Sequence, residues 1–243
     1  MRRRAVLIVG IIVTVGCLVS EAAAQAPRPS SPMILVLGNA TWLNPSDIRA
    51  ATGAVVKQEL GNFQLKDFAV IVLANAAFTS LPGPVQQGLV EYVNIGGTLL
   101  LTGGSQSFGS GGYQAVAPII PFEIRASGDW RPTPFRSPIS IQPGHPILAG
   151  VEFLTVGAIN DMNPRADASE ILQAAGGGSA AGRITGRGGG SFPNPLIAEV
   201  GVGAGRVIGV AIDLNDFAGM RDRDLFVRNT IGYLLRTSRM GKG

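Results

Sequence analysis

The sequence has few of the side chains that enzymes use as nucleophiles and bases. Its 243 residues include one cysteine, Cys17, and one histidine, His145. Cys17 lies in an N-terminal segment with the features of a signal peptide, so the mature chain would contain no thiol. That excludes thiol catalysis and a disulfide scaffold, and it fits an exported protein without disulfide bonds. A serine nucleophile would have to use His145, because no other histidine exists to serve as its base.

The N-terminal segment is typical of an export signal. Three arginines at positions 2–4 precede an apolar stretch over residues 5–15, and alanines 22–24 supply a small-residue cleavage site. The apolar stretch is too short to span a bilayer comfortably. We expect residues 1–24 to be a cleaved signal peptide, residues 25–32 a linker, and the mature protein to be periplasmic or extracellular with no stable membrane span. The alternatives are an uncleaved anchor and lipidation of Cys17, although Thr14 departs from the lipoprotein pattern.

Charged residues are also sparse, at 15% of the sequence. Loss of the signal peptide would remove three arginines and Glu21, which lowers the formal net charge from +4 to +2. A charge so near zero gives no reason to expect binding to nucleic acid. The apolar fraction of 46% and the 34 glycines indicate one domain with a sizeable core and many tight turns.

The hydrophobic pattern predicts an α/β domain over residues 33–236, followed by a tail over residues 237–243. Residues 69–74 and 98–102 are typical of buried strands, and residues 85–94 between them have the period of an amphipathic helix. A strand, a crossover helix and a parallel strand build an open α/β sheet, in which ligands bind beyond the carboxyl ends of the strands.

Further elements follow from the same patterns. We expect a first strand over 33–37, a helix that starts at Asn44 and ends at Gly61, a short helix over 115–120, a hairpin over 196–212 that closes the sheet, and a final helix over 224–235 with Leu225, Val227, Ile231, Leu234 and Leu235 facing inward. Weaker strands are predicted over 122–126, 139–142, 153–158 and 170–174. The glycine-rich segment 176–191 is interpreted as an exposed mobile loop.

Two glycine-rich segments do not match nucleotide-binding motifs. The loop over residues 103–112 lacks the Lys-Ser/Thr ending of a phosphate-binding loop. Residues 201–205 precede a strand and not a helix, as a dinucleotide fingerprint would require. We therefore expect no cofactor and interpret both segments as turns.

Several motifs resemble a known family. They are the strand at 67–73, the stretch Gly96-Gly97 to Gly104, the glycine loop at 107–113, His145-Pro146-Ile147, and residues 203–208 followed by Asp213. Together they resemble the class I glutamine amidotransferase-like superfamily, in a noncatalytic-looking branch similar to domains of bacterial von Willebrand-associated surface proteins and trehalose-utilisation-type domains. The resemblance implies a flavodoxin-like, mostly parallel sheet with helices on both faces, extended by a C-terminal hairpin and helix.

The resemblance also implies which residues a catalytic member would need. In such members a nucleophilic cysteine follows the strand that matches residues 98–102, and a histidine and a glutamate follow a later strand. Here the first position reads Gly103-Gly104-Ser105, and Asp213 stands after the later strand. Thiolate attack on a glutamine amide is therefore not expected, and no catalytic residue is assigned.

Polar residues near the predicted strand ends are the candidate ligand-binding residues. They are Asn39, Asn75, Ser105, Gln106, Ser107, His145 and Asp213. Simpler roles stay open: His145 as a turn residue bonded locally, and the serines as partners of loop amides. Asp213, Asn215 and Asp216 supply oxygen atoms but not the spacing of a calcium loop, and no metal is expected. Arg221 and Arg223 are interpreted as exposed partners of Asp222 and Asp224.

These observations favour an exported, nonenzymatic binding or interaction module of the cell envelope. Its partner would be an unknown protein or small molecule, and the sequence leaves the oligomeric state open. The alternative is a hydrolase of unknown substrate that uses Ser105 or Asp213 at the strand ends.

Overall fold

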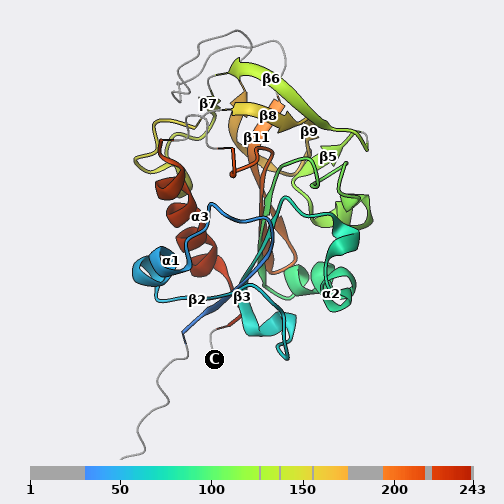
Figure 1. The fold of residues 1–243 in the computed structure, drawn as a ribbon, viewed down its shortest axis with the longest axis vertical. Helices are drawn as coiled ribbons and strands as arrows, with labels where there is room; N and C mark the ends of the chain where they lie inside the picture. The colour runs from blue at the N-terminus through green and yellow to red at the C-terminus, as the bar shows by residue number, and fades with distance from the viewer. Residues whose placement is uncertain are drawn as a thin grey trace, which may run out of the picture.

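An eight-stranded sheet forms the centre of the molecule (Figure 1). The computed structural model describes residues 31–125, 127–136, 138–154, 156–174, 194–216 and 221–241. In the order in which they pair, the strands are β2 (Val55–Lys57), β1 (Met33–Gly38), β3 (Phe68–Ala74), β4 (Thr98–Thr102), β12 (Gly205–Val210), β11 (Asn194–Val202), β10 (Ser169–Ala174) and β7 (Pro138–Ser140). The first five run parallel and the last three alternate in direction.

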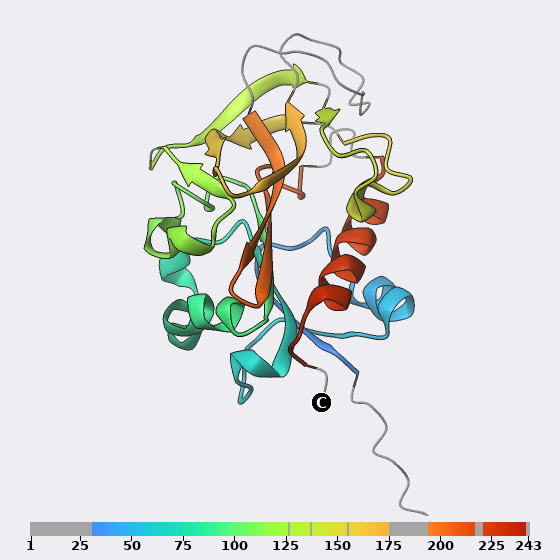
Figure 2. The same ribbon diagram turned by 180° about the vertical axis from the view of Figure 1, so that it is seen from behind.

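Helices cover both faces of this sheet. Helices α1 (Pro45–Thr52) and α3 (Arg223–Thr237) pack on one face, and α2 (Gly83–Asn94) with the 3-10 helix η3 (Tyr113–Ile119) covers the other (Figures 1 and 2). Each face buries its own hydrophobic cluster. Shorter 3-10 turns are η1 (Leu65–Asp67), η2 (Phe78–Ser80) and η4 (Pro146–Leu148). Strand β3 is buried along its whole length because both faces are covered.

The order of the five parallel strands, β2-β1-β3-β4-β12, is the flavodoxin-like order. In that order the chain reverses direction across the sheet between β1 and β3. The loops that leave these two strands at their carboxyl ends therefore diverge, and ligands of such sheets bind in the resulting crevice. The predicted α/β class with a large, mostly parallel sheet is confirmed.

Two small antiparallel sheets lie beyond the carboxyl ends of the parallel strands (Figure 1). One pairs β5 (Phe122–Ile124) with β9 (Met162–Pro164), and the other pairs β6 (Trp130–Arg136) with β8 (Val156–Asn160). Strand β8 joins the main sheet through an isolated bridge between Ile159 and Ile212. The sequence did not predict β6 or β9, and the strand expected over 153–158 lies further along.

The predicted helix from Asn44 to Gly61 is wrong in its second half. The start is as expected, since the Asn44 side chain accepts a hydrogen bond from the Ser46 amide. The helix ends at Gly53, which adopts a left-handed conformation with φ +73° and donates its N–H to the Arg49 carbonyl. The β-branched residues after it form the edge strand β2 beside β1.

The C-terminal elements differ from expectation in detail. The hairpin β11–β12 forms, but it lies inside the sheet between β4 and β10 and does not close it. On α3, Phe226 is buried while Leu225 and Leu235 are only half-buried. Residues 238–241 continue against the domain, where the Arg239 amide donates to the Gly96 carbonyl at 2.9 Å.

Some predictions lie outside the described residues. They include the signal peptide over residues 1–24 and the glycine-rich segment 176–191. Within the described ranges, no helix is long and apolar enough to cross a membrane.

Candidate functional site

Polar side chains from three loops meet at the carboxyl edge of the parallel strands. We call Asn39, Thr41, Asn75, Asp213 and Asn215 the carboxyl-edge cluster. Asn39 and Thr41 follow β1, Asn75 follows β3, and Asp213 and Asn215 follow β12. The Asn39 amide donates to the Ala74 carbonyl at 2.7 Å, which holds the first two loops together at the reversal point of the sheet.

Asp213 is the acceptor at the centre of this cluster. Its Oδ2 accepts a hydrogen bond from Asn75 Nδ2 at 2.9 Å. Its Oδ1 accepts from both the backbone N–H and the side-chain Nδ2 of Asn215, each at 2.9 Å. Asn215 Nδ2 also donates to the Asn39 carbonyl at 2.7 Å, and its Oδ1 accepts from the Thr41 amide at 3.1 Å. Both carboxylate oxygens of Asp213 are therefore engaged in holding loops.

The chain leaves β4 through two glycines that have no room for a side chain. A Cβ on Gly103 would lie 2.6 Å from the Ala211 carbonyl carbon and from Asn160 Oδ1. Gly104 has φ +138°, and a Cβ there would lie 2.2 Å from Asn75 Cγ. The Gly104 amide donates to Asn160 Oδ1 at 2.9 Å. The two glycines thus allow the turn that was expected at this point.

Beyond the glycines, Ser105 and Gln106 are exposed beside the carboxyl-edge cluster. The Gln106 amide donates to Asn75 Oδ1 at 2.9 Å. Ser107, in contrast, is buried, and its hydroxyl donates to the Thr102 carbonyl at 2.7 Å. The Ser107 hydroxyl thus satisfies the last carbonyl of β4 and does not bond a loop amide.

A buried carboxylate fixes the rest of the glycine loop. Asp129 is 1% exposed and accepts hydrogen bonds from the amides of Gly109 and Ser110 and from the Ser110 hydroxyl, each at 2.9 Å. Phe108 and Tyr113 of the same loop pack into the core on the α2 side of the sheet. The loop is therefore held at both ends, and it leads away from α3.

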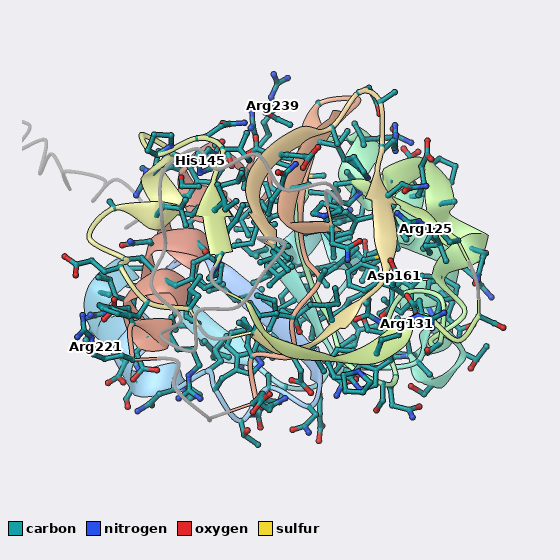
Figure 3. All side chains as sticks on the ribbon, turned by 90° about the horizontal axis from the view of Figure 1, so that it is seen from above. Arg125, Arg131, His145, Asp161, Arg221 and Arg239 are labelled. Atoms are coloured by element: carbon teal, nitrogen blue, oxygen red, sulfur yellow. The ribbon has the colours of Figure 1, made fainter. Side chains whose placement is uncertain are left out.

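His145 lies in a different place, on the face of the sheet that α3 covers. Its Nε2 is 3.1 Å from Glu199 Oε2, and its ring meets that of Tyr233 edge to face with centroids 5.1 Å apart. The Tyr233 hydroxyl also donates to Glu199, which forms an ion pair with Arg206. We call Glu199, His145, Arg206 and Tyr233 the α3-face cluster. Figure 3 shows His145 on the side of the molecule that carries α3.

The surroundings of His145 favour its neutral form. Its Nδ1 accepts a hydrogen bond from the Ile147 amide at 3.4 Å, which caps the turn η4. Nε2 then carries the proton and donates it to Glu199. Burial lowers the pKa of His145 below its ordinary value of 6.5, and the positive charge of Arg206 lowers it further. A second proton on the ring would also destroy the cap, because Nδ1 would become a donor facing a donor.

Ser105 and His145 do not come together. Glu199 pairs with Ile208 on β12, which in turn pairs with Leu100 on β4. Two strand spacings, roughly 10 Å, separate Glu199 from β4 across the sheet, and Ser105 lies further along, beyond the strand end. The structure thus brings together Asn39, Asn75 and Asp213, with Ser105 and Gln106 beside them. It leaves His145 with the α3-face cluster and Ser107 inside the core.

Sequence reasoning missed several residues that shape these sites. Asn160, Asp129, Glu199 and Tyr233 lie in segments whose hydrophobic pattern carries no sign of a polar network. Asn215 was considered only as a source of metal-ligating oxygen, whereas its side-chain amide links the loop after β12 to the loop after β1. Its position two residues after Asp213, just beyond a buried strand, was the one available signal.

The arginines near the start of α3 also differ from expectation. Arg221 is exposed, as predicted, and its guanidinium lies 3.8 Å from the centre of the Phe153 ring. Arg223 does pair with Asp224, but its side chain is only 13% exposed. Asp222 accepts hydrogen bonds from the amides of Glu152 and Phe153 at 2.8 and 2.9 Å, which lower its pKa.

Charged residues on the opposite side of the molecule form ordinary surface ion pairs. Asp161 lies 2.9 Å from Arg125 and 3.4 Å from Arg131, and both arginine side chains are well exposed. Figure 3 shows these three residues together, away from His145. Exposed pairs of this kind contribute little to stability, and nothing in their geometry indicates chemistry.

Comparison with known proteins shows a shared fold without a sequence family. No protein-family model matches the sequence, and a search of the curated proteins finds no match. A cytoplasmic protein from Salmonella typhimurium has a TM-score of 0.63 at 15% identity, with 86% of this chain and 99% of that chain covered. A ThuA-like protein from Bacteroides uniformis has a TM-score of 0.55 at 11% identity, with 88% and 96% covered.

A third structure places the same fold inside a larger enzyme. A β-galactosidase from Rahnella sp. R3 has a TM-score of 0.50 at 11% identity, and the match covers 87% of this chain but 32% of the enzyme. At such identities the likeness shows the fold alone. The fold is shared with ThuA-like proteins, which supports the amidotransferase-like resemblance at the level of architecture.

Proposed function

We propose that this chain is an exported, nonenzymatic binding module of the noncatalytic amidotransferase-like branch, and that it binds its ligand at the carboxyl-edge cluster. The observation that carries the proposal is the separation of Ser105 and Asp213 from His145. A serine nucleophile needs an aligned base. The only imidazole in the sequence is held by Glu199 and the Ile147 amide on the α3 face.

The rival hydrolase reading has no support in the geometry of Asp213. A carboxylate that acts as a base or nucleophile must present a free oxygen to the substrate. Here Oδ1 accepts two hydrogen bonds and Oδ2 accepts one, all from amides of Asn75 and Asn215. Three of the roughly four acceptor sites of this carboxylate therefore hold loops, so its role is better explained as positioning the cluster.

The free polar groups at this edge indicate the chemistry of the ligand. The side chains of Asn39, Ser105 and Gln106 are exposed, and none has a hydrogen-bond partner among the described residues. All three are neutral and can both donate and accept. They flank the point where the strand order reverses, the usual ligand position in such sheets. We infer a neutral small molecule that carries hydroxyl or amide groups.

A calorimetric titration tests this assignment. The probes are glutamine, glucose and trehalose, and the variants are Asn39→Ala and Gln106→Ala, with Gln58→Ala as a control because Gln58 is an exposed glutamine at the sheet edge. We expect at least one probe to bind the wild type and to bind each site variant about tenfold more weakly, the loss of roughly one good hydrogen bond. Equal affinity for all four proteins would place the ligand elsewhere.

Export is the second part of the proposal. The signal features of residues 1–24 support it, although two structures of the same fold carry the name of cytoplasmic proteins. N-terminal sequencing of the protein produced in a bacterial host decides the matter. We expect a mature chain that begins at Gln25. A chain that begins at Cys17 with a lipid mass would establish lipoprotein anchoring, and an intact Met1 in the cytosol would rule out export.

A further inference from the structure

A groove runs along α3 next to α1, and two of its lining residues, Pro146 and Gly232, adjoin His145 and Tyr233 of the α3-face cluster in the chain. It has a volume of about 510 Å³, and the residues that line it include Pro146, Leu225, Arg228, Gly232, Leu235 and Arg236. Arg228, Gly232 and Arg236 are spaced by four residues, so they follow one another along the same side of the helix. One arginine thus lies one helical turn before Gly232, and the other lies one turn after it.

Among the described residues, neither of these arginines forms an ion pair with an acidic side chain. Every acidic residue of the sequence except Glu21 lies in the described part of the chain, and none of them is within ion-pair distance of Arg228 or Arg236. Of the other described arginines, Arg49 and Arg239 likewise form no ion pair, whereas several do. Arg125, Arg165, Arg206 and Arg221 each contact at least one carboxylate. The groove therefore holds two exposed arginines without a direct ion pair, although Asp224 stands one helical turn before Arg228.

Gly232 keeps the floor of the groove open. A Cβ at this position would lie 3.4 Å from Arg236 Nη1, so the guanidinium extends back over the glycine. Glycine is a poor choice for the middle of a fifteen-residue helix, because it loses more backbone freedom on folding than other residues. The position tolerates a methyl group sterically, so tight packing does not explain the glycine.

We propose that this groove docks an acidic segment of a partner polypeptide, with carboxylates on Arg228 and Arg236. The half-buried Leu225 and Leu235 and the exposed Pro146 give the groove apolar walls, which favours a peptide over a bare polyanion. The two arginines are eight residues apart, roughly 12 Å along the helix axis. Two acidic side chains four residues apart on an extended chain span about the same distance. This inference goes beyond the ligand site at the carboxyl edge and does not depend on it.

Fluorescence anisotropy with labelled peptides tests the proposal on the purified mature chain. The probes are peptides of about twelve residues that carry two glutamates separated by two, three or seven apolar or neutral residues, and the same peptides with lysine in place of glutamate. We expect the glutamate peptides alone to bind, and their affinity to fall as salt is raised from about 50 to 300 mM, because the contacts are exposed charges.

The decisive variant is Gly232→Glu. The new carboxylate lies four residues from Arg228 and four from Arg236, so it can pair with either arginine in place of a peptide carboxylate. Glutamate also has a higher helix propensity than glycine. We expect binding of the acidic peptides to fall about tenfold while the melting temperature stays equal or rises. Lys66→Ala, in η1 on the α2 side, makes the same change of net charge and should leave binding unchanged.

Three results would overturn the proposal. The first is that no glutamate peptide binds at concentrations up to about 1 mM, which would place any Kd above the millimolar range. The second is equal weakening by Lys66→Ala and Gly232→Glu, which would show a general charge effect. The third is that a short polyphosphate binds and no peptide does, and that Gly232→Glu abolishes the binding of polyphosphate. If Gly232→Glu does not fold, the double variant Arg228→Ala, Arg236→Ala takes its place with the same expected loss.

Discussion

The carboxyl-edge cluster and the α3-face cluster divide the polar residues of the protein between two tasks. The first consists of neutral amides around one carboxylate, and it leaves exposed groups that can contact a ligand. The second holds the histidine, a glutamate, an arginine and a tyrosine hydroxyl, the side chains of acid–base chemistry, but it uses them to join β11, β12, α3 and η4. Residue types that suggest catalysis thus join secondary-structure elements in the α3-face cluster, while the carboxyl-edge cluster contains neither histidine nor tyrosine.

The glycines at the ligand edge should be the most sensitive positions in this comparison. Gly104→Ala places a Cβ 2.2 Å from Asn75 at φ +138°, and Gly103→Ala places one 2.6 Å from the Ala211 backbone. We expect each to lower the free energy of unfolding by about 4 kcal/mol, from strain and overpacking combined. Urea denaturation measures this loss. Gly128→Ala is the control, since nothing lies within 4 Å of its Cβ position. A loss similar to that of the control would mean that the turn out of β4 is not as tight as described.

Removal of the central carboxylate of the α3-face cluster should rank next. Glu199→Ala leaves the Tyr233 hydroxyl and the His145 ring without their acceptor, and Arg206 without its carboxylate, although Arg206 still donates to the Tyr233 hydroxyl at 2.8 Å. Because Arg206 is 35% exposed and water can solvate part of its charge, we expect a loss of about 3 kcal/mol, at the lower end for a broken buried pair. Glu199→Gln keeps one acceptor oxygen and should cost less. A loss below about 1 kcal/mol for Glu199→Ala would show that the cluster is solvated.

The pH dependence of stability tests the role of His145 in the α3-face cluster, and its expected effect is smaller than that of Glu199→Ala. The pKa of His145 is lower in the folded protein than in the unfolded chain, so the unfolded chain binds a proton first as pH falls. The contribution of His145 is therefore fully present above pH 6.5 and is lost as pH falls from 6.5 through the lowered pKa of the folded state.

Chemical denaturation at several pH values, with His145→Asn as the comparison, measures this contribution. Asparagine can still cap η4 but does not titrate. We expect the wild type to lose stability over that pH range and the variant to lose less. Asp222, whose pKa is also lowered, acts only at more acid pH, below its ordinary value of 3.8. If stability depends on pH in the same way in the two proteins, the titration of His145 does not contribute to stability in this range.

The parts of the fold that the sequence predicted are those set by local pattern. The unit of β3, α2 and β4 follows from two buried runs around an amphipathic helix, and its boundaries agree with the structure within two residues. Strand β2 was predicted as helix because Val55 and Val56 also fit a helical period, and only pairing with β1 decides between the two. Strand β6 pairs with residues about 20 to 30 positions away and β9 with residues about 40 positions away, which no local window contains.

The candidate site was predictable to the same extent. Asn39, Asn75 and Asp213 each follow a buried strand, and parallel strands end at one edge, so their meeting was foreseeable. The position of His145 was not, because its partners Glu199 and Tyr233 lie 54 and 88 residues further along the chain and on other elements.

The central claim is that this edge binds without catalysing, and ammonia release from glutamine tests it most directly. The purified mature chain, Ser105→Ala and His145→Ala are assayed side by side for ammonia over a buffer blank. Because Ser105 has no aligned base and Asp213 is held by three hydrogen bonds, we expect no release above the blank from any of the three. Turnover by the wild type that is lost in both variants would contradict the account and establish a Ser105–His145 site.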